Sequence, residues 1–335
     1  MAYCTVSIGS GVAESIYGDS QFPIKSYIEH KGEGFEKQSV LPQLFRMDSS
    51  THFAEKYSGD TAMDDFVPVG EGGAYPQNGF EEGYSKILSS MTWKSKFDVT
   101  QEMVEDATLL PMRKKANGLM TAHNRTREEF GRYLYAGGLK GTTVQMGGKT
   151  FDCSSADGKA LFAKDHPNKI KKDTQSNLYA GDFTAANLST AETIMQNRTG
   201  DNGELLSVTP DTILIPNDGV LKNTVFSVIG ADKDPGTSNN AYNYHYGRWN
   251  VIVDPYLTRA LAKLGITYKP WMLLDSQFNE AQDGAVFIDR VKLAIKSVLN
   301  EDNDNNVWKG RSRFSGGFVD WRFALAGGVT GGSDL

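Results

Sequence analysis

The chain has 335 residues, of which 39% are hydrophobic and 23% are charged, and its formal net charge is −6. That length and apolar content suffice for one elaborate domain or for two. An acidic chain gains little from counterion release on phosphates, which argues against general DNA or RNA binding. No apolar run is long enough to span a membrane, and the N-terminus lacks the basic and apolar blocks of a signal peptide.

The two cysteines, Cys4 and Cys153, lie far apart in the sequence. Neither belongs to a CxxC pair, and no HxxxH spacing accompanies them, so they predict neither a disulfide framework nor a zinc site. Phosphate-binding patterns such as GxGxxG and GxxxxGK are also missing from the turn-rich N-terminal third. We therefore expect no metal and no cofactor.

The first third of the chain indicates segments that need a partner surface. Residues 1–62 show no sustained hydrophobic period and are expected to form an N-terminal arm. Residues 64–97 carry turn signals at 70–73 and 76–79, which predict a long two-stranded excursion with a glycine-rich tip. A lone hairpin is marginally stable in water, so this excursion should lie on another surface.

A long helix is predicted next. Thr100 is a suitable N-cap, Pro111 should break or restart the helix, and Gly137 with Gly138 should end it. We expect His123 to be a packed histidine. The apolar positions recur at three- and four-residue steps and are Met112, Ala116, Leu119, Met120, His123, Phe130 and Leu134.

The stretch LFAKDHPN, residues 161–168, places an aspartate next to one of only five histidines. An Asp–His pair could act in acid–base chemistry. However, no serine or cysteine nucleophile stands at a recognisable elbow, and no second histidine is placed to ligate a metal. Asp165 before His166 and Pro167 also suits a turn. A turn is the favoured interpretation, with an enzyme using Asp165 and His166 as the alternative.

The second half predicts an α/β lobe followed by long strands. Helices near 188–195 and 219–229 alternate with strands at 208–216, 249–253 and 271–274. In residues 290–296 apolar and basic residues alternate, which is typical of a half-buried strand with a charged face. Residues 308–326 are rich in aromatic residues, arginine and glycine.

The order of arm, hairpin, long helix, α/β lobe and return strands resembles the HK97-fold major capsid protein of tailed bacteriophages. It is most similar to the Mu-like major head subunit branch. The resemblance covers about residues 50–330 and rests on four stretches: FVPVGEGGAYP, FDVTQEMVEDA, LFAKDHPN and GGFVDWRFALAGG. It implies an α+β, HK97-like capsid fold with an N-terminal arm, an extended β-hairpin loop, a peripheral domain with a long spine helix, and an α/β axial domain.

The resemblance also implies a division of the chain and roles for its residues. The expected parts are an arm (1–62), an extended loop (63–99), a peripheral domain with spine helix and following loop (100–182), an axial domain (183–280) and return strands of the peripheral domain (281–335). The extended loop would contact other subunits through Val69, Tyr75, Phe80, Tyr84, Ile87 and Trp93. The spine helix would be built on Met112, Ala116, Leu119, Met120, Phe130 and Leu134. The family landmarks are Asp165, His166, Asp320, Trp321 and Arg322.

The implied function is structural and not enzymatic. Copies would self-assemble as hexamers and pentamers into an icosahedral shell that encloses double-stranded DNA without sequence-specific binding. The shell would form in the host cytoplasm, become the virion capsid, and involve a portal protein, a possible decoration protein and no membrane. The segment before the hairpin is too short and aperiodic for a built-in scaffolding region, so a separate scaffolding protein is expected.

Two further points concern the loop lysines and the class of shell. Some relatives crosslink through a loop lysine, but nothing identifies an acceptor for Lys86, Lys94 or Lys96, and we expect no crosslink. An encapsulin-like bacterial compartment shell would use the same fold and is the alternative within the structural class.

Overall fold

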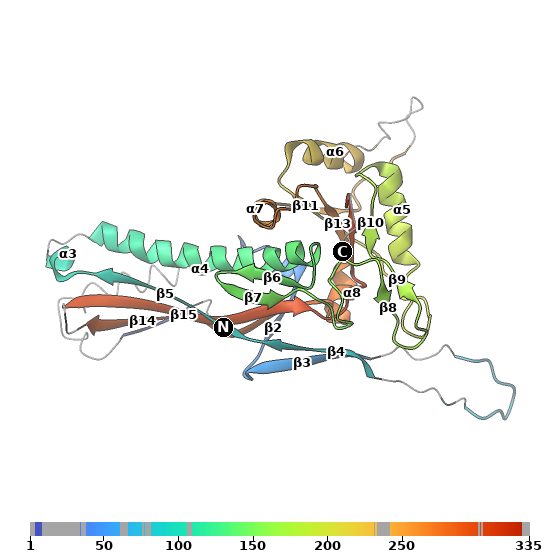
Figure 1. The fold of residues 1–335 in the computed structure, drawn as a ribbon, viewed down its shortest axis with the longest axis horizontal. Helices are drawn as coiled ribbons and strands as arrows, with labels where there is room; N and C mark the ends of the chain where they lie inside the picture. Colours follow the sequence, from blue (N-terminus) through green and yellow to red (C-terminus); the bar gives the residue numbers. More distant parts are fainter. Residues whose placement is uncertain are drawn as a thin grey trace.

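The computed structural model describes residues 4–8, 34, 38–60, 66–75, 77, 82–105, 109–230, 232, 242–300, 302 and 304–329. Its most extended feature is a five-stranded sheet, called here the long sheet (Figure 1). The antiparallel pair β14 (Ala285–Asn300) and β15 (Asn305–Phe318) forms its centre, and β5 (Met91–Val99) pairs antiparallel with β15. Two strands pair parallel with β14: β1 (Cys4–Ile8) and β2 (Arg46–Ser49).

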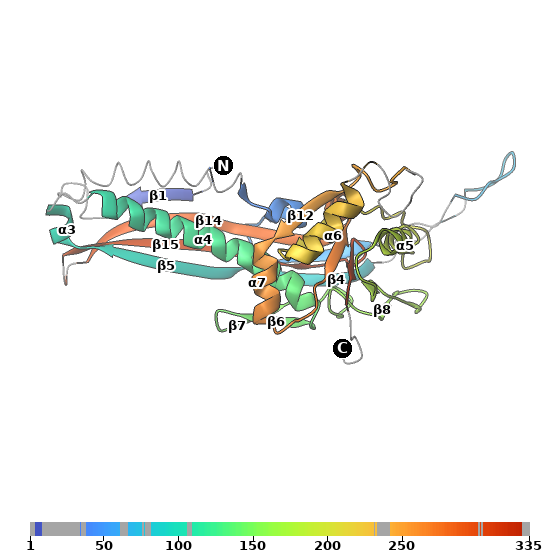
Figure 2. The ribbon, with the colours of Figure 1, turned by 90° about the horizontal axis from the view of Figure 1, so that it is seen from above.

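One face of the long sheet is covered by α4 (Leu109–Gly138), a helix of 30 residues that runs along the strands (Figure 2). Leu119 and Met120 pack on Trp308 and on neighbouring apolar residues of the sheet. The shorter α3 (Gln101–Glu105) precedes it. Of the two predicted effects of Pro111, a restart of the helix is confirmed: α4 begins at Leu109, and the proline lies in its first turn, where its missing N–H needs no partner.

The C-terminal end of α4 uses glycine to approach a small hairpin. A Cβ at Gly137 would lie 2.6 Å from Cys153 Sγ and 2.8 Å from Val144 Cβ. The hairpin consists of β6 (Thr143–Met146) and β7 (Lys149–Asp152). The predicted helix end at Gly137 and Gly138 is confirmed, and the two glycines also permit this close packing.

A second five-stranded sheet has the order β10-β16-β13-β11-β12. The C-terminal strand β16 therefore lies inside this sheet, so the expectation that all of residues 281–335 return to the long sheet is wrong. Only β14 and β15 do so. The strands are β10 (Leu178–Tyr179), β11 (Thr212–Pro216), β12 (Asn250–Asp254), β13 (Trp271–Leu274) and β16 (Ala324–Gly327).

Aspartates at the ends of three of these strands begin the helices that follow. Asp218, Asp254 and Asp275 each accept a hydrogen bond from a backbone N–H of the next helix's first turn. Such N-caps satisfy helix donors that have no partner within the helix. The helices around the second sheet are α5 (Ala185–Gln196), α6 (Gly219–Ile229), α7 (Pro255–Lys263) and α8 (Ser276–Ala281).

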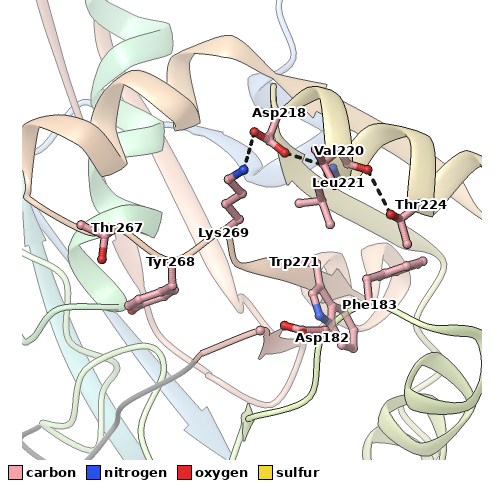
Figure 3. A pocket seen from close by; sticks show the side chains of 11 residues that line it. Asp182, Phe183, Asp218, Val220, Leu221, Thr224, Thr267, Tyr268, Lys269 and Trp271 are labelled. Carbon is pink, nitrogen blue, oxygen red and sulfur yellow. Dashed lines mark hydrogen bonds and ion pairs between the residues drawn. The ribbon is translucent and has the colours of Figure 1, made fainter.

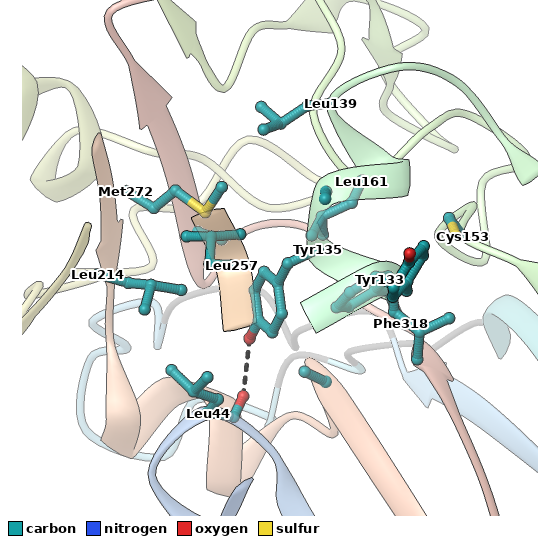
Figure 4. Packing of buried hydrophobic residues seen from close by; sticks show 14 of the residues in the cluster. Leu44, Tyr133, Tyr135, Leu139, Cys153, Leu161, Leu214, Leu257, Met272 and Phe318 are labelled. Carbon is teal, nitrogen blue, oxygen red and sulfur yellow. Dashed lines mark hydrogen bonds between the residues drawn. The ribbon is translucent and has the colours of Figure 1, made fainter. Parts of the chain in front are cut away.

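The two sheets share one hydrophobic core (Figure 4). Tyr135 of α4 is buried there and donates a hydrogen bond from its hydroxyl to the carbonyl oxygen of Leu44, at 2.7 Å. Leu44 belongs to the short helix α2 (Leu41–Leu44). Leu257 of α7 and Met272 of β13 join the same cluster from the second sheet. The two halves of the chain are therefore packed as one body.

The excursion predicted at residues 64–97 is a hairpin with different strands. It pairs β3 (Ala54–Asp60) with β4 (Glu82–Ser89), so its first strand lies within the predicted arm. After Ser90 the chain enters β5, which belongs to the long sheet. We call residues 54–89 the hairpin loop. A further short pair, β8 (His166–Pro167) and β9 (Thr174–Gln175), completes the described strands. No described helix combines the length and apolarity of a membrane span.

The close approach at Gly137 gives a first prediction. Gly137→Ala should lower the free energy of unfolding by about 1–3 kcal/mol, because the new methyl group overlaps Cys153 and Val144. Gly118→Ala in the same helix meets nothing within 4 Å and should instead raise the stability by up to about 1 kcal/mol. Urea unfolding of the unassembled subunit measures both changes. Equal effects of the two substitutions would contradict this packing.

Candidate assembly surfaces and the junction behind them

The LFAKDHPN and DWRF stretches meet at a buried junction between the two sheets. The His166 ring is fully buried and stacks on the indole of Trp321, with centroids 4.1 Å apart and planes 10° apart. Its Nδ1 lies 2.6 Å from Asp157 Oδ2. Asp165 points elsewhere and forms an exposed ion pair with Lys159. The adjacent Asp165 and His166 therefore do not form a catalytic pair, and the carboxylate partner of His166 is Asp157.

Asp157 illustrates how the junction holds a buried charge. Burial favours the protonated form, but the hydrogen bond and positive charge of His166 outweigh it and keep the pKa of Asp157 below its ordinary value. Because the pKa of Asp157 is lower in the folded state, its ionised carboxylate stabilises the fold at pH values above the ordinary pKa of aspartate. That stability is lost as the pH falls through the folded pKa. The contact between His166 and Asp157 therefore stabilises the folded subunit at neutral pH.

Two arginines of the same junction contact the ring of Trp321. Arg198 and Arg322 lie over its ring, with guanidinium carbons 5.2 Å and 5.4 Å from the ring centroid. Arg198 donates to the backbone carbonyl of Arg322, and to that of Ala324 at 3.1 Å. Because it is buried, its pKa is lowered to about 9, so the group remains largely protonated at neutral pH. These contacts fix the chain where it passes from β15 into β16.

Arg322 links the junction to the loop after α5. Its Nη2 lies 2.9 Å from Asp201 Oδ1, and its Nη1 lies 3.2 Å from Asp320 Oδ2. Burial lowers the pKa of Arg322, but the two carboxylates outweigh burial and raise it above the ordinary value. A polar cavity of about 440 Å³ borders Asp201 and Arg322. The carboxylates of Asp201 and Asp320 are both held by Arg322, so neither is available as a general base.

The root of the hairpin loop is fastened to the body by two lysines. Lys86 of β4 is buried, and its Nζ lies 3.1 Å from Asp152 Oδ2 and 3.2 Å from Ser154 Oγ. The second lysine, Lys169, lies three residues after His166, and its Nζ donates hydrogen bonds to the carbonyl oxygens of Glu82 and Gly83. The direction in which the loop leaves the body is therefore set by interactions within one subunit.

The far part of the hairpin loop exposes apolar side chains to solvent. Phe66 and Tyr75 are 99% and 98% exposed, and Val69 is 53% exposed. Ile87, nearer the root, is also exposed, whereas Tyr84 is half-buried next to Lys169. Figure 1 shows the described residues 66–75 lying away from both sheets. Contiguous exposed apolar groups of this kind are typical of interaction surfaces.

Of the two remaining predicted loop contacts, Trp93 differs from its expected position. Trp93 stacks on Phe314 at 5.0 Å and on Phe151 at 5.9 Å between ring centroids, within its own subunit. It packs in the core because β5 pairs with β15 and does not belong to the hairpin loop. Phe80 lies outside the described residues.

Five of the six predicted spine-helix residues lie on the buried side of α4. Ala116, Leu119 and Met120 pack near its start, and Phe130 and Leu134 pack in the shared core. The side chain of Met112 lies outside the described part. His123 packs with its ring edge-on to Phe314, and burial together with the Arg127 charge lowers its pKa to about 3.

Comparison with known proteins identifies the family. Residues 84–327 match the family model described as phage capsid protein. The chain belongs to the phage capsid protein family. It is a major capsid protein of HK97-like fold that forms the head shell, and it is a structural component of the virion and not an enzyme. No curated protein sequence matches this chain.

Two solved structures support the fold of this capsid protein. A chain from Mycobacterium phage Patience is 12% identical, with a TM-score of 0.54, and the match covers 91% of this chain and 86% of that one. The capsid of cyanophage P-SCSP1u is 9% identical, with a TM-score of 0.51, and the match covers 86% and 87%. At such identities the likeness supports the fold and says nothing of individual residues.

Two further features of the capsid protein are candidates for chemistry: a cavity and a buried cysteine. A cavity of about 440 Å³ lies between α6, the start of β13 and Gly328 (Figure 3). Two carboxylates line it: Asp218 pairs with Lys269 at 2.7 Å and accepts a hydrogen bond from the backbone N–H of Leu221, and Asp182 is exposed. Cys153 is buried, which raises the pKa of its thiol to about 12 and makes it unreactive. Among the described residues, no three His, Cys, Asp or Glu side chains gather as a metal site.

Sequence reasoning missed most of the junction. Asp157, Arg198 and Asp201 were not predicted, although each contacts a landmark residue. In the sequence these three residues are charged residues in segments that indicate turns. Most such residues are exposed, so the pattern gave no reason to expect these three to be buried. The landmarks His166, Trp321 and Arg322 are brought together, whereas Asp165 lies at the exposed edge.

The junction gives a second prediction. His166→Ala should lower the free energy of unfolding by about 2–4 kcal/mol, because it removes the Trp321 stack and leaves the buried Oδ2 atom of Asp157 without its partner. The adjacent Asp165→Ala, which removes only an exposed ion pair, should change stability by about 0.5 kcal/mol or less. Denaturant unfolding compares them. A large effect of Asp165→Ala with none from His166→Ala would reverse the roles assigned to these neighbours.

Proposed function

We propose that each copy of this capsid protein holds a neighbouring copy by laying its hairpin loop over it. The observation that carries the proposal is the exposure of Phe66, Val69 and Tyr75 on a loop whose root is fixed by Lys86 and Lys169. A fixed root and an apolar far end fit a contact that is completed only by another subunit. Burying these side chains would contribute about 25 cal/mol for each Å² of apolar surface.

The division of the chain follows from the same proposal. The long sheet with α4 would form the peripheral domain, and the second sheet with its helices would form the axial domain. The axial domain exposes apolar residues for contacts around the five- and sixfold axes of pentamers and hexamers. These residues are Val220, Phe226, Tyr242, Tyr244 and Tyr246.

The finer assignments rest on the sequence resemblance and on the family. They comprise the Mu-like branch, an icosahedral shell around double-stranded DNA, a separate scaffolding protein, a portal protein and a possible decoration protein. Family membership supports a shell that must be filled through a portal. Nothing in the described residues favours an encapsulin-like compartment or chemistry at Asp165 and His166.

A loop replacement tests the proposed contact. Replacing residues 63–80 with a short Gly–Ser linker should leave the subunit folded, because the root contacts of Lys86 and Lys169 lie outside the replaced segment. It should abolish shells in sedimentation and electron microscopy of the expressed protein, since each modest contact recurs at every subunit of the shell. A matched control is Leu205→Ser, which removes an exposed apolar residue elsewhere. Normal shells from the replaced chain would contradict the proposed contact.

A further inference from the structure

The face of the long sheet that points away from α4 is lined with basic residues. On β15, Trp308, Gly310 and Phe314 face the helix, so the alternating residues between them face the other way. On β5, Trp93 and Phe97 likewise face inward. We call the resulting surface the basic face. It comprises Lys94, Lys96, Lys296, Lys309, Arg311 and Arg313.

The strand register places these like charges directly beside one another. Lys309 pairs with Lys96 on one side and with Lys296 on the other. Arg311 lies opposite Lys94. Directly opposed like charges destabilise a sheet, so the arrangement does not serve the isolated subunit. An anionic partner would relieve the repulsion.

Few carboxylates of the same strands neutralise this face. Asp289 pairs with Arg127 on the α4 side of the sheet, and Asp98 lies 3.6 Å from Lys96. Within the described part of the chain, Arg313 has no carboxylate partner, and its Nε is buried without a hydrogen bond. Burial and the neighbouring charges of Arg290 and Arg311 lower the pKa of Arg313, which reflects the same crowding.

The chain itself carries the complementary anion. Residues 60–83 of the hairpin loop contain six acidic residues and no lysine, arginine or histidine. The chain has 41 acidic residues in all, so the remaining 35 equal its 35 lysines and arginines. The whole net charge of −6 is therefore carried by this one segment. Opposite charges on the loop and the basic face fit two surfaces of the same chain that meet between copies.

We propose that the basic face of one subunit receives the acidic hairpin loop of a neighbouring subunit. The proposal rests on the proposed function and names the surface on which the loop lies. Aromatic side chains such as Phe66 and Tyr75 would lie on the aliphatic stems and guanidinium groups of the basic face. The loop carboxylates would pair with its charges, except Glu82, which pairs with Lys56 of its own subunit. Nucleic acid is the competing anion, but it would not account for the charge segregation within this chain.

A charge swap tests this pairing. Lys309→Glu with Arg311→Glu reverses the basic face, and Asp65→Lys with Glu71→Lys reverses charges in the loop sequence. Each pair alone should lower the yield of sedimenting shells by about tenfold, since like charges would then meet at every contact. All four substitutions together should restore at least about half of the wild-type yield, because opposite charges face each other again.

Controls separate assembly from folding and from total charge. Lys164→Glu with Lys172→Glu makes the same charge change at two other exposed lysines and should assemble like the wild type. Circular dichroism and thermal unfolding of each unassembled variant should match the wild type. Raising the salt concentration should weaken wild-type assembly, because it screens exposed charges over distances of about 10 Å.

The outcomes distinguish this inference from the proposed function. Normal shells from the Lys309→Glu, Arg311→Glu variant would overturn the inference while leaving the capsid role intact. Normal shells that contain less DNA would also overturn it and assign the basic face to nucleic acid. Failure of the four-substitution variant to assemble, when both pairs fold, would count equally against it. An absence of shells from the wild-type chain would overturn the proposed function itself, and this inference with it.

Discussion

The stack of Trp321 on His166 is the contact on which the rest of the structure depends. At Trp321 the chain leaves the long sheet and enters the second sheet, so its position sets the relation of the two. An aromatic stack alone contributes about 0.5–1.5 kcal/mol. The buried Asp157, Arg198 and Arg322 around it add interactions that weaken sharply if either stacking partner moves.

The same junction has a mechanical consequence for assembly. Lys169 lies three residues after the buried His166 and donates hydrogen bonds to the carbonyl oxygens of Glu82 and Gly83 at the loop root. The loop is therefore anchored to the point where the two sheets meet. Tyr135 and Met272 belong to one hydrophobic core that joins the two sheets behind that root. A loop directed from such a body suits a subunit that repeats one contact many times.

Local sequence signals predicted much of this fold. The helix at Gly219–Ile229 and the strand at Trp271–Leu274 have the predicted bounds, because aspartate caps and prolines mark their limits. The hairpin loop was misplaced because only Ser90 separates β4 from β5, with no glycine or proline to signal the change of partner strand. The stack of His166 on Trp321 joins distant segments. Spacing could not predict it, and only the family resemblance singled out both residues.

The central claim is that the hairpin loop completes its contacts on a neighbouring subunit. Cryo-electron microscopy of the assembled shell tests it most directly, because the path of residues 66–75 can be traced from the fixed root. The account predicts that Phe66 and Tyr75, almost fully exposed in the single subunit, are buried against an adjacent copy. A loop that folds back on its own subunit, or stays exposed in the finished shell, would contradict it.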